Sequence, residues 1–192
     1  MGRAKAYDEE EVLEKALHCF WNHGYHNTSI RLLEKEMGIN QFSIYASFKS
    51  KSQLYQRILR RYIDFLNNNY LNKLRSESCN LKEIEQFLIA FGKDMKSGEI
   101  PSCCLMVRSI LDYKDFDNQI KKVIDDFIQM ISSLYSEALI NNRNKRATSK
   151  HSSTKTDVDY LVGLTQSISI MNQHMTSKQL VTYIKNSVGK LN

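Results

Sequence analysis

The scarcity of residues that turn a chain limits most strongly how this sequence can fold. The 192 residues include one proline and seven glycines, whereas an all-β domain needs many turns. Apolar residues also recur every three or four positions, which gives a helix one apolar face. The first such series is Val12, Leu13, Ala16, Leu17, Phe20 and Trp21. The sequence therefore predicts an all-α protein.

Capping signals divide the first 75 residues into four expected helices. Asp8 is the expected N-cap of the first helix, and Gly24 is its expected C-cap. Thr28 is expected to cap the second helix. Ser50 with Gln53 forms a capping box for the fourth. The expected helices cover residues 9–24, 29–37, 41–47 and 51–75.

Four or five more helices are expected beyond residue 75. Asn80 with Glu83 opens one of them, and Asp115 starts a long one. Residues 141–156 are polar and basic, which predicts a surface loop. The last two helices are expected over residues 158–175 and 176–188, and Thr176 with Gln179 is the expected cap of the second.

The positive charge of the chain is concentrated toward its N-terminus. The net charge is +6; residues 1–75 carry 12 basic and 8 acidic residues, and the remaining 117 carry 15 and 13. Residues 40–61 contain no acid and five basic residues, which are Lys49, Lys51, Arg57, Arg60 and Arg61. This distribution is typical of a polyanion-binding module on a nearly neutral body.

Other classes of protein lack support in the sequence. No stretch approaches 18 consecutive apolar residues, so we expect no membrane partner. The N-terminus has no apolar signal core, and the four cysteines fit neither a disulfide framework nor a zinc pattern. We therefore expect a cytoplasmic protein with no metal site and no cofactor. Enzyme motifs such as phosphate-cradling glycine loops and nucleophile elbows are missing, so we expect no enzyme.

Two short predicted helices joined at Gly38 form a helix-turn-helix candidate, because a tight turn with positive φ favours glycine. In such a motif the second helix lies in the major groove, with its N-terminal residues at the base edges. Ile39 and Ile44 are expected to face the core. Phe42 either touches a thymine methyl group or packs. The side chains that can reach bases and phosphates are Asn40, Gln41, Ser43 and Tyr45.

Three segments carry a resemblance to a known family. They are Thr28-Ser29-Ile30-Arg31-Leu32-Leu33, Gly38-Ile39-Asn40 and Ile44-Tyr45-Ala46-Ser47-Phe48-Lys49-Ser50-Lys51. From about residue 10 to 60 the chain resembles the DNA-binding domain of TetR-type transcriptional regulators. The resemblance implies phosphate contacts from Thr28, Ser29, Tyr45 and Lys51, and a base contact from Arg31. The expected DNA-binding residues are Thr28, Ser29, Arg31, Asn40, Gln41, Phe42, Ser43, Tyr45, Lys49 and Lys51.

Some positions depart from the pattern of that family. Ala46 stands where a larger aromatic residue or histidine often lies, and Phe42 is bulky and apolar among the base readers. Glu34 and Glu36 occupy places often taken by alanine. If Glu34 faces the third helix, the packing there must differ from that of the family.

The rest of the chain is similar to the family in length, in helical character and in the fragment Cys103-Cys104-Leu105-Met106-Val107. Here Cys103 replaces a glycine and Arg108 replaces a usual asparagine. The resemblance implies an effector pocket in the C-terminal domain. The expected pocket residues are Tyr62, Phe91, Cys104, Arg108, Phe127 and Met130.

The resemblance implies a two-domain bacterial repressor. Residues 1–50 form the helix-turn-helix DNA-binding domain, and residues 51–192 form the ligand-binding and dimerisation domain, with helix 51–75 as the connector. A homodimer through the last two helices binds a near-palindromic double-stranded DNA operator and is released by a small molecule. Gly163, inside one of these helices, is expected to allow a close helix approach across the dimer interface.

Two alternative functions remain open at this point. The first is a repressor that senses oxidants or electrophiles through Cys103 and Cys104, with Arg108 one turn away to stabilise a thiolate. Buried cysteine, however, is commonly a small core residue. The second is a helical protein-interaction module without specific DNA binding.

Overall fold

The computed structural model describes residues 7–146 and 154–191, and every regular element in these ranges is helical. The all-α prediction is therefore confirmed. The elements are α1 (Glu9–Asn27), α2 (Ile30–Met37), α3 (Gln41–Phe48), α4 (Lys51–Asn69), η1 (Leu71–Arg75), α5 (Leu81–Ser97), α6 (Leu105–Leu111), η2 (Tyr113–Asp115), α7 (Asn118–Arg146), α8 (Thr154–Met171) and α9 (Ser177–Gly189).

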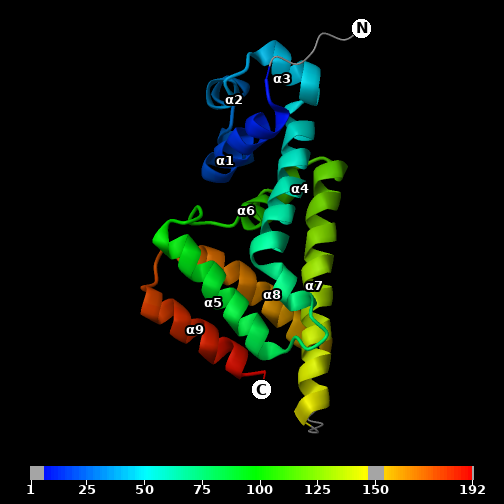
Figure 1. Ribbon diagram of the computed structural model, residues 1–192, viewed down its shortest axis with the longest axis vertical. Coiled ribbons are helices and arrows are strands. Elements are labelled where there is room, and N and C mark those ends of the chain that lie inside the picture. The colour runs from blue at the N-terminus through cyan, green and yellow to red at the C-terminus, as the bar shows by residue number, and fades with distance from the viewer. Residues whose placement is uncertain (1–6, 147–153, 192) are drawn as a thin grey trace.

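The helices form a small head and a larger body that are joined by α4. Figure 1 shows α1, α2 and α3 at one end of the molecule and α4 running from them down into the body. In the body, α4 packs against α7, while α5, α8 and α9 pack together beside this pair (Figure 1). The short helix α6 touches α1, α4 and α7, so it lies between the head and the body.

The start of α2 differs from the prediction at Thr28. The N-cap is Ser29, whose Oγ accepts a hydrogen bond from Leu32 N at 3.1 Å. Thr28 is fully buried, and its hydroxyl donates to Gly24 O at 2.6 Å. Gly24 has φ 75° and ψ 172°, which breaks the helical path of α1 without ending the element. A residue with a side chain adopts such a positive φ only at a cost.

The ends of two long helices also differ from the prediction. Asp117 rather than Asp115 caps α7, because its Oδ1 accepts from the backbone of Gln119 at 2.9 Å and of Ile120 at 3.0 Å. The helix α4 ends at Asn69, and residues 71–75 form the separate 3-10 turn η1.

The predicted loop over residues 141–156 is wrong at both of its ends. Residues 141–146 continue α7, and α8 already begins at Thr154; residues 147–153 lie outside the described part. The Asn141 side chain explains the longer α7. Its Nδ2 donates to the carbonyls of Glu77 and Cys79, both at 3.0 Å, which fixes this turn of the helix against the start of α5.

Two capping boxes predicted from the sequence are confirmed, and a third is only half formed. Asn80 with Glu83 opens α5, and Thr176 with Gln179 opens α9, each with both reciprocal bonds present. Ser50 caps α4 by accepting from Gln53 N at 3.1 Å.

Gly92 allows two helices of this chain to approach closely, whereas Gly163 does not have this role within the chain. A Cβ added at Gly92 on α5 would lie 2.9 Å from Leu180 Cδ2 on α9, whereas one added at Gly163 would meet nothing within 4 Å. Gly163 is exposed on α8. Its expected role between two copies of the chain stays a prediction.

Buried hydrogen bonds hold α6 in place between head and body. Trp21 Nε1 on α1 donates to Cys103 O at 2.8 Å, just before α6. Tyr55 OH on α4 lies 2.8 Å from Ser109 Oγ on α6, whose own hydrogen is donated to Leu105 O at 2.8 Å. Tyr55 therefore donates to Ser109, and burial raises the pKa of its phenol, which stays neutral at physiological pH.

We predict that Tyr55→Phe lowers the free energy of unfolding by about 1 kcal/mol, the usual net contribution of one buried hydrogen bond. For a chain of this size, that loss lowers Tm by roughly 2–4 °C. Calorimetry of the variant measures it. Tyr113→Phe is the matched control, since the Tyr113 hydroxyl donates to Asp125 at an exposed position. Equal effects of the two variants would contradict the role given to Tyr55.

Candidate nucleic-acid interface and interior cavity

Gly38 builds the turn between α2 and α3. It has φ 72° and ψ 19°, and its N–H donates to Glu34 O at 3.1 Å, which ends α2. Asn40 then caps α3, because its Oδ1 accepts from Ser43 N at 2.9 Å. The amide nitrogen of Asn40 is free of this bond and can reach DNA as a donor. The turn of residues 38–40 joins the two helices as in a helix-turn-helix.

Glu34, one of the departures from the family pattern, faces α3. Its Oε1 accepts the backbone N–H of Gln41 at 3.2 Å. A carboxylate is favourable at a helix N-terminus because the unpaired N–H groups there carry partial positive charge. Glu34 thus fixes the first turn of α3 relative to α2.

The two sides of α3 differ sharply in exposure. Ile44 and Phe48 are 0% and 2% exposed and pack into the core, as does Ile39 before them. Phe42 is 88% exposed and Tyr45 is 42% exposed. The alternative that Phe42 packs within its own chain is therefore wrong. A phenyl ring left in water on this face is available to an external partner.

Residues 40–61 contain no acid, but acidic side chains of α1 lie beside them in the fold. Arg57 Nη2 lies 2.5 Å from Glu9 Oε1, and Arg61 pairs with Glu10 at 2.5 Å and with Glu14 at 2.9 Å. These glutamates come from the first turns of α1. Two of the five basic side chains therefore join α4 to α1 instead of facing a polyanion.

Arg31 and Lys49 are two of the basic side chains that remain open on the head. Both are exposed, and neither forms an ion pair within the described residues. Lys49 ends α3 with φ 63°, which is unusual for a residue with a side chain. Its N–H donates to Tyr45 O at 2.9 Å, so this turn directs the chain into α4.

The structure changes the role expected for Thr28 and shows a ring contact for Lys51. Thr28 is fully buried with its hydroxyl bonded to Gly24, so it is removed from the expected phosphate contacts. Lys51 Nζ lies 4.3 Å from the centre of the Tyr25 ring, and burial lowers its pKa. Ser29 keeps a hydroxyl hydrogen for a phosphate, since its oxygen is the acceptor at the start of α2.

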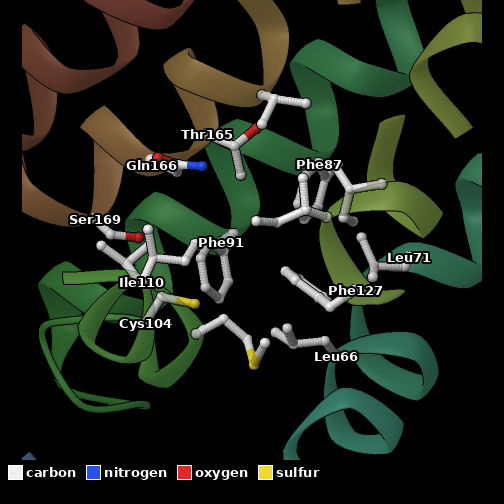
Figure 2. A pocket seen from close by; sticks show the side chains of 15 residues that line it. Leu66, Leu71, Phe87, Phe91, Cys104, Ile110, Phe127, Thr165, Gln166 and Ser169 are labelled. Carbon is white, nitrogen blue, oxygen red and sulfur yellow. The ribbon is translucent and has the colours of Figure 1, made fainter. Parts of the chain in front are cut away.

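An apolar cavity of about 40 Å³ lies in the body between α4, α5, α6, α7 and α8. Figure 2 shows Phe91, Cys104 and Phe127, three of the residues expected in a pocket, among its lining side chains. This volume holds about three water molecules. Sites for small organic ligands occupy about 300–1,000 Å³, so a ligand must widen the cavity to bind there.

Three of the expected pocket residues lie elsewhere. Tyr62 is fully buried beside the cavity wall, and its hydroxyl donates to Cys104 Sγ at 3.3 Å. Met130 lies outside the lining, with its sulfur 3.4 Å from Arg75 Nη2. Arg108 lines a separate cleft on the other side of α6.

The sequence pattern did not indicate the part of the cavity wall that α8 supplies. Thr165, Gln166 and Ser169 of α8 contribute to it, as Figure 2 shows. Their signal in the sequence is a run of small and polar residues inside a helix whose other buried positions are apolar, such as Leu161, Leu164 and Ile168.

The neighbouring thiols of Cys103 and Cys104 are both buried. Burial raises the pKa of each thiol, and for Cys103 the charge of Arg108 opposes this rise only in part. Thiolate is the reactive form of cysteine. The structure thus gives these residues little of the activation that a thiol sensor requires.

No three His, Cys, Asp or Glu side chains of the described residues gather closely enough to hold a metal ion. No helix within residues 7–146 and 154–191 has the length and apolar character needed to cross a membrane.

Comparison with known proteins agrees with this geometry. Residues 12–58 match the family of bacterial regulatory proteins called tetR. The transcriptional repressor ComR of Escherichia coli is 30% identical over 109 residues, which are 56% of this chain and 52% of ComR. The negative regulator of the biofilm operon in Staphylococcus aureus, IcaR, is 24% identical over 124 residues, 65% of each chain. The matched part thus spans about half to two thirds of these relatives.

The fold is also that of solved regulators. The regulator CifR, in a complex with a 26-base-pair operator DNA, has a TM-score of 0.81 over 98% of both chains at 18% identity. This likeness is one of fold, a helix-turn-helix head on an all-helical body. The head of the chain is similar to that of the bacterial regulatory proteins of the tetR family, whose model matches residues 12–58.

We predict that Cys103 and Cys104 are alkylated by iodoacetamide at pH 7 more slowly in the folded protein than in denaturant, because burial hides both thiols and lowers their thiolate fraction. The rate in the folded protein should increase as pH rises toward the raised pKa values. Mass spectrometry of the modified peptides measures both rates. Equal rates at pH 7 would favour the thiol-sensing alternative.

Proposed function

We propose that the chain is a ligand-responsive transcriptional repressor that binds a near-palindromic operator as a homodimer. The observation that carries the proposal is the exposed face of α3, which Gly38 and Glu34 hold in a defined position with Phe42 and Tyr45 in solvent. The repressor names of ComR and IcaR, and the operator DNA bound to CifR, support the same reading.

The proposed DNA-binding unit is residues 1–50, and residues 51–192 regulate it, with α4 as the connector. Arg31, Gln41 and Phe42 read bases, since they are exposed on α2 and at the start of α3. The proposed phosphate contacts come from the hydroxyl groups of Ser29, Ser43 and Tyr45 and from the ammonium groups of Lys49 and Lys51. DNA binding is proposed to take place in the cytoplasm, where bacterial DNA lies.

The proposed dimer forms through α8 and α9. Three apolar side chains of α8 are exposed in the single chain: Tyr160 at 37%, Ile170 at 46% and Met171 at 37%. Gly163 lies between them with open space beyond its backbone. Burying such a face against its copy is favourable. A dimer places two heads about 34–36 Å apart, on half-sites one helical turn apart.

The proposed effector acts by favouring a body in which the cavity is wide. Such a ligand shifts the population toward that state because it binds there more tightly. If the wide state holds the two heads at another separation, DNA affinity falls by the same coupling factor.

The first experiment selects operator fragments from random DNA and measures affinity by fluorescence anisotropy against a scrambled duplex. A preference of at least about a thousandfold is expected of a specific regulator. Equal affinity for both duplexes would favour the protein-interaction alternative.

We predict that Phe42→Ala abolishes recognition of a thymine methyl group. Replacing the contacted thymine by deoxyuridine should weaken the wild-type protein about fivefold or more, within the range of a base contact. The same replacement should leave the affinity of Phe42→Ala unchanged. Leu111→Ala is the control, since Leu111 is 71% exposed on the body. A variant Phe42→Ala that still distinguishes the two bases would refute this role.

We predict that Lys49→Gln weakens binding to every DNA sequence alike and lowers the slope of log affinity against log salt by about 0.9 per half-site, as expected when one phosphate contact is lost. Salt titrations of the selected operator and of scrambled DNA measure it. Lys93→Gln, an exposed lysine on α5 in the body, should leave the slope unchanged. A change in sequence preference without a change in slope would contradict the phosphate contact.

A further inference from the structure

A second cleft of about 430 Å³ lies where the end of α1 meets α6 and α8, outside the apolar cavity. Its volume falls within the range of small-molecule sites, without any widening. The side chains that matter for its chemistry are His23, His26, Arg108, Asp112, Ser169 and His174.

The cleft contains one guanidinium, that of Arg108, and one carboxylate, that of Asp112. Arg108 forms no ion pair with a carboxylate in the described parts of the chain; its Nη1 donates to Asn22 O at 3.3 Å instead. The carboxylate of Asp112 lies 4.0 Å from His26 Nε2. A guanidinium has a planar array of donors that suits a carboxylate or another oxyanion.

Ser169 joins this cleft to the apolar cavity, because its side chain lines both. It is fully buried, and its Oγ has no hydrogen-bond partner within the described residues. Figure 2 shows Ser169 among the side chains around the cavity, together with Cys104, which directly precedes α6, and Ile110 of α6. A buried hydroxyl without a partner is unfavourable, and a polar ligand atom would supply the partner.

We propose that this site takes a small amphipathic carboxylate as the effector. Its carboxylate binds Arg108 and accepts a hydrogen bond from Ser169 Oγ, and its hydrocarbon chain enters the widened apolar cavity. The carboxylate then competes with Asn22 O for the guanidinium. Because Asn22 lies on α1, this exchange removes one of the contacts between head and body. The regulatory role of the bound carboxylate rests on the proposed function, whereas the binding site does not.

Calorimetry on the full chain without DNA tests the site, with octanoate as the probe, below its micelle concentration. Octanol keeps the chain without the charge, and acetate keeps the charge without the chain. We expect octanoate to bind at least about tenfold more tightly than either, because it alone engages both the guanidinium and the apolar cavity. Octanoate binding no tighter than octanol would overturn the proposal.

Variants assign the contacts. Arg108→Gln should weaken octanoate about tenfold and leave octanol unchanged, whereas Arg108→Lys should restore most of the affinity. Arg60→Gln, an exposed arginine on α4 outside the cleft, is the control. Ser169→Ala should weaken octanoate and at the same time raise Tm of the free protein, because it removes the unpaired hydroxyl. Octanoate affinity unaffected by either Arg108 variant would place the anion elsewhere and overturn the proposal.

Anisotropy with the selected operator separates this inference from the proposed function. Octanoate should release wild-type protein from DNA and should not release Arg108→Gln at the same concentration. Charge-dependent octanoate binding by a protein that binds no specific DNA would support the site and contradict the proposed repressor. Specific DNA binding with no octanoate binding would do the reverse.

Discussion

One continuous apolar core connects the head to the body, and the position of the DNA-binding surface depends on it. The buried face of α4 includes Leu54 and Ile58 near the head and Leu66 near the cavity. Because the same helix packs against α1 and against α7, a displacement in the body cannot leave the head untouched. Close-packed interiors transmit such displacements instead of absorbing them.

Local signals predicted the parts of the fold that depend on near neighbours. The Gly38 turn, the capping boxes at Asn80 and Thr176, and the buried side of α3 all follow from residues within one or two turns. Thr28 and Asp115 misled the prediction because a second capping residue of the same chemistry follows closely in each case, Ser29 and Asp117. Burial decides which of two chemically equivalent residues caps the helix, and the local sequence pattern does not contain that information.

Long-range contacts account for what the sequence could not predict at the site. The glutamates of α1 and the arginines of α4 are nearly fifty residues apart, so their pairing is invisible in a charge count along the chain. The head consequently offers DNA fewer free charges than its composition indicates, and more of its discrimination must come from shape and from the side chains of α3. In the same way, the hydroxyls of α8 became part of a cavity wall only through the fold.

The near closure of the apolar cavity also has a volumetric consequence. Folded proteins resist pressure less when they contain larger voids, because unfolding or collapse of a void reduces the volume of the system. The present cavity of about 40 Å³ is small, whereas a widened and empty form would contain a larger void. Hydrostatic pressure therefore favours the closed form over an empty wide one, and a ligand that fills the space removes that difference. Hydrostatic pressure would thus oppose the widening of the apolar cavity.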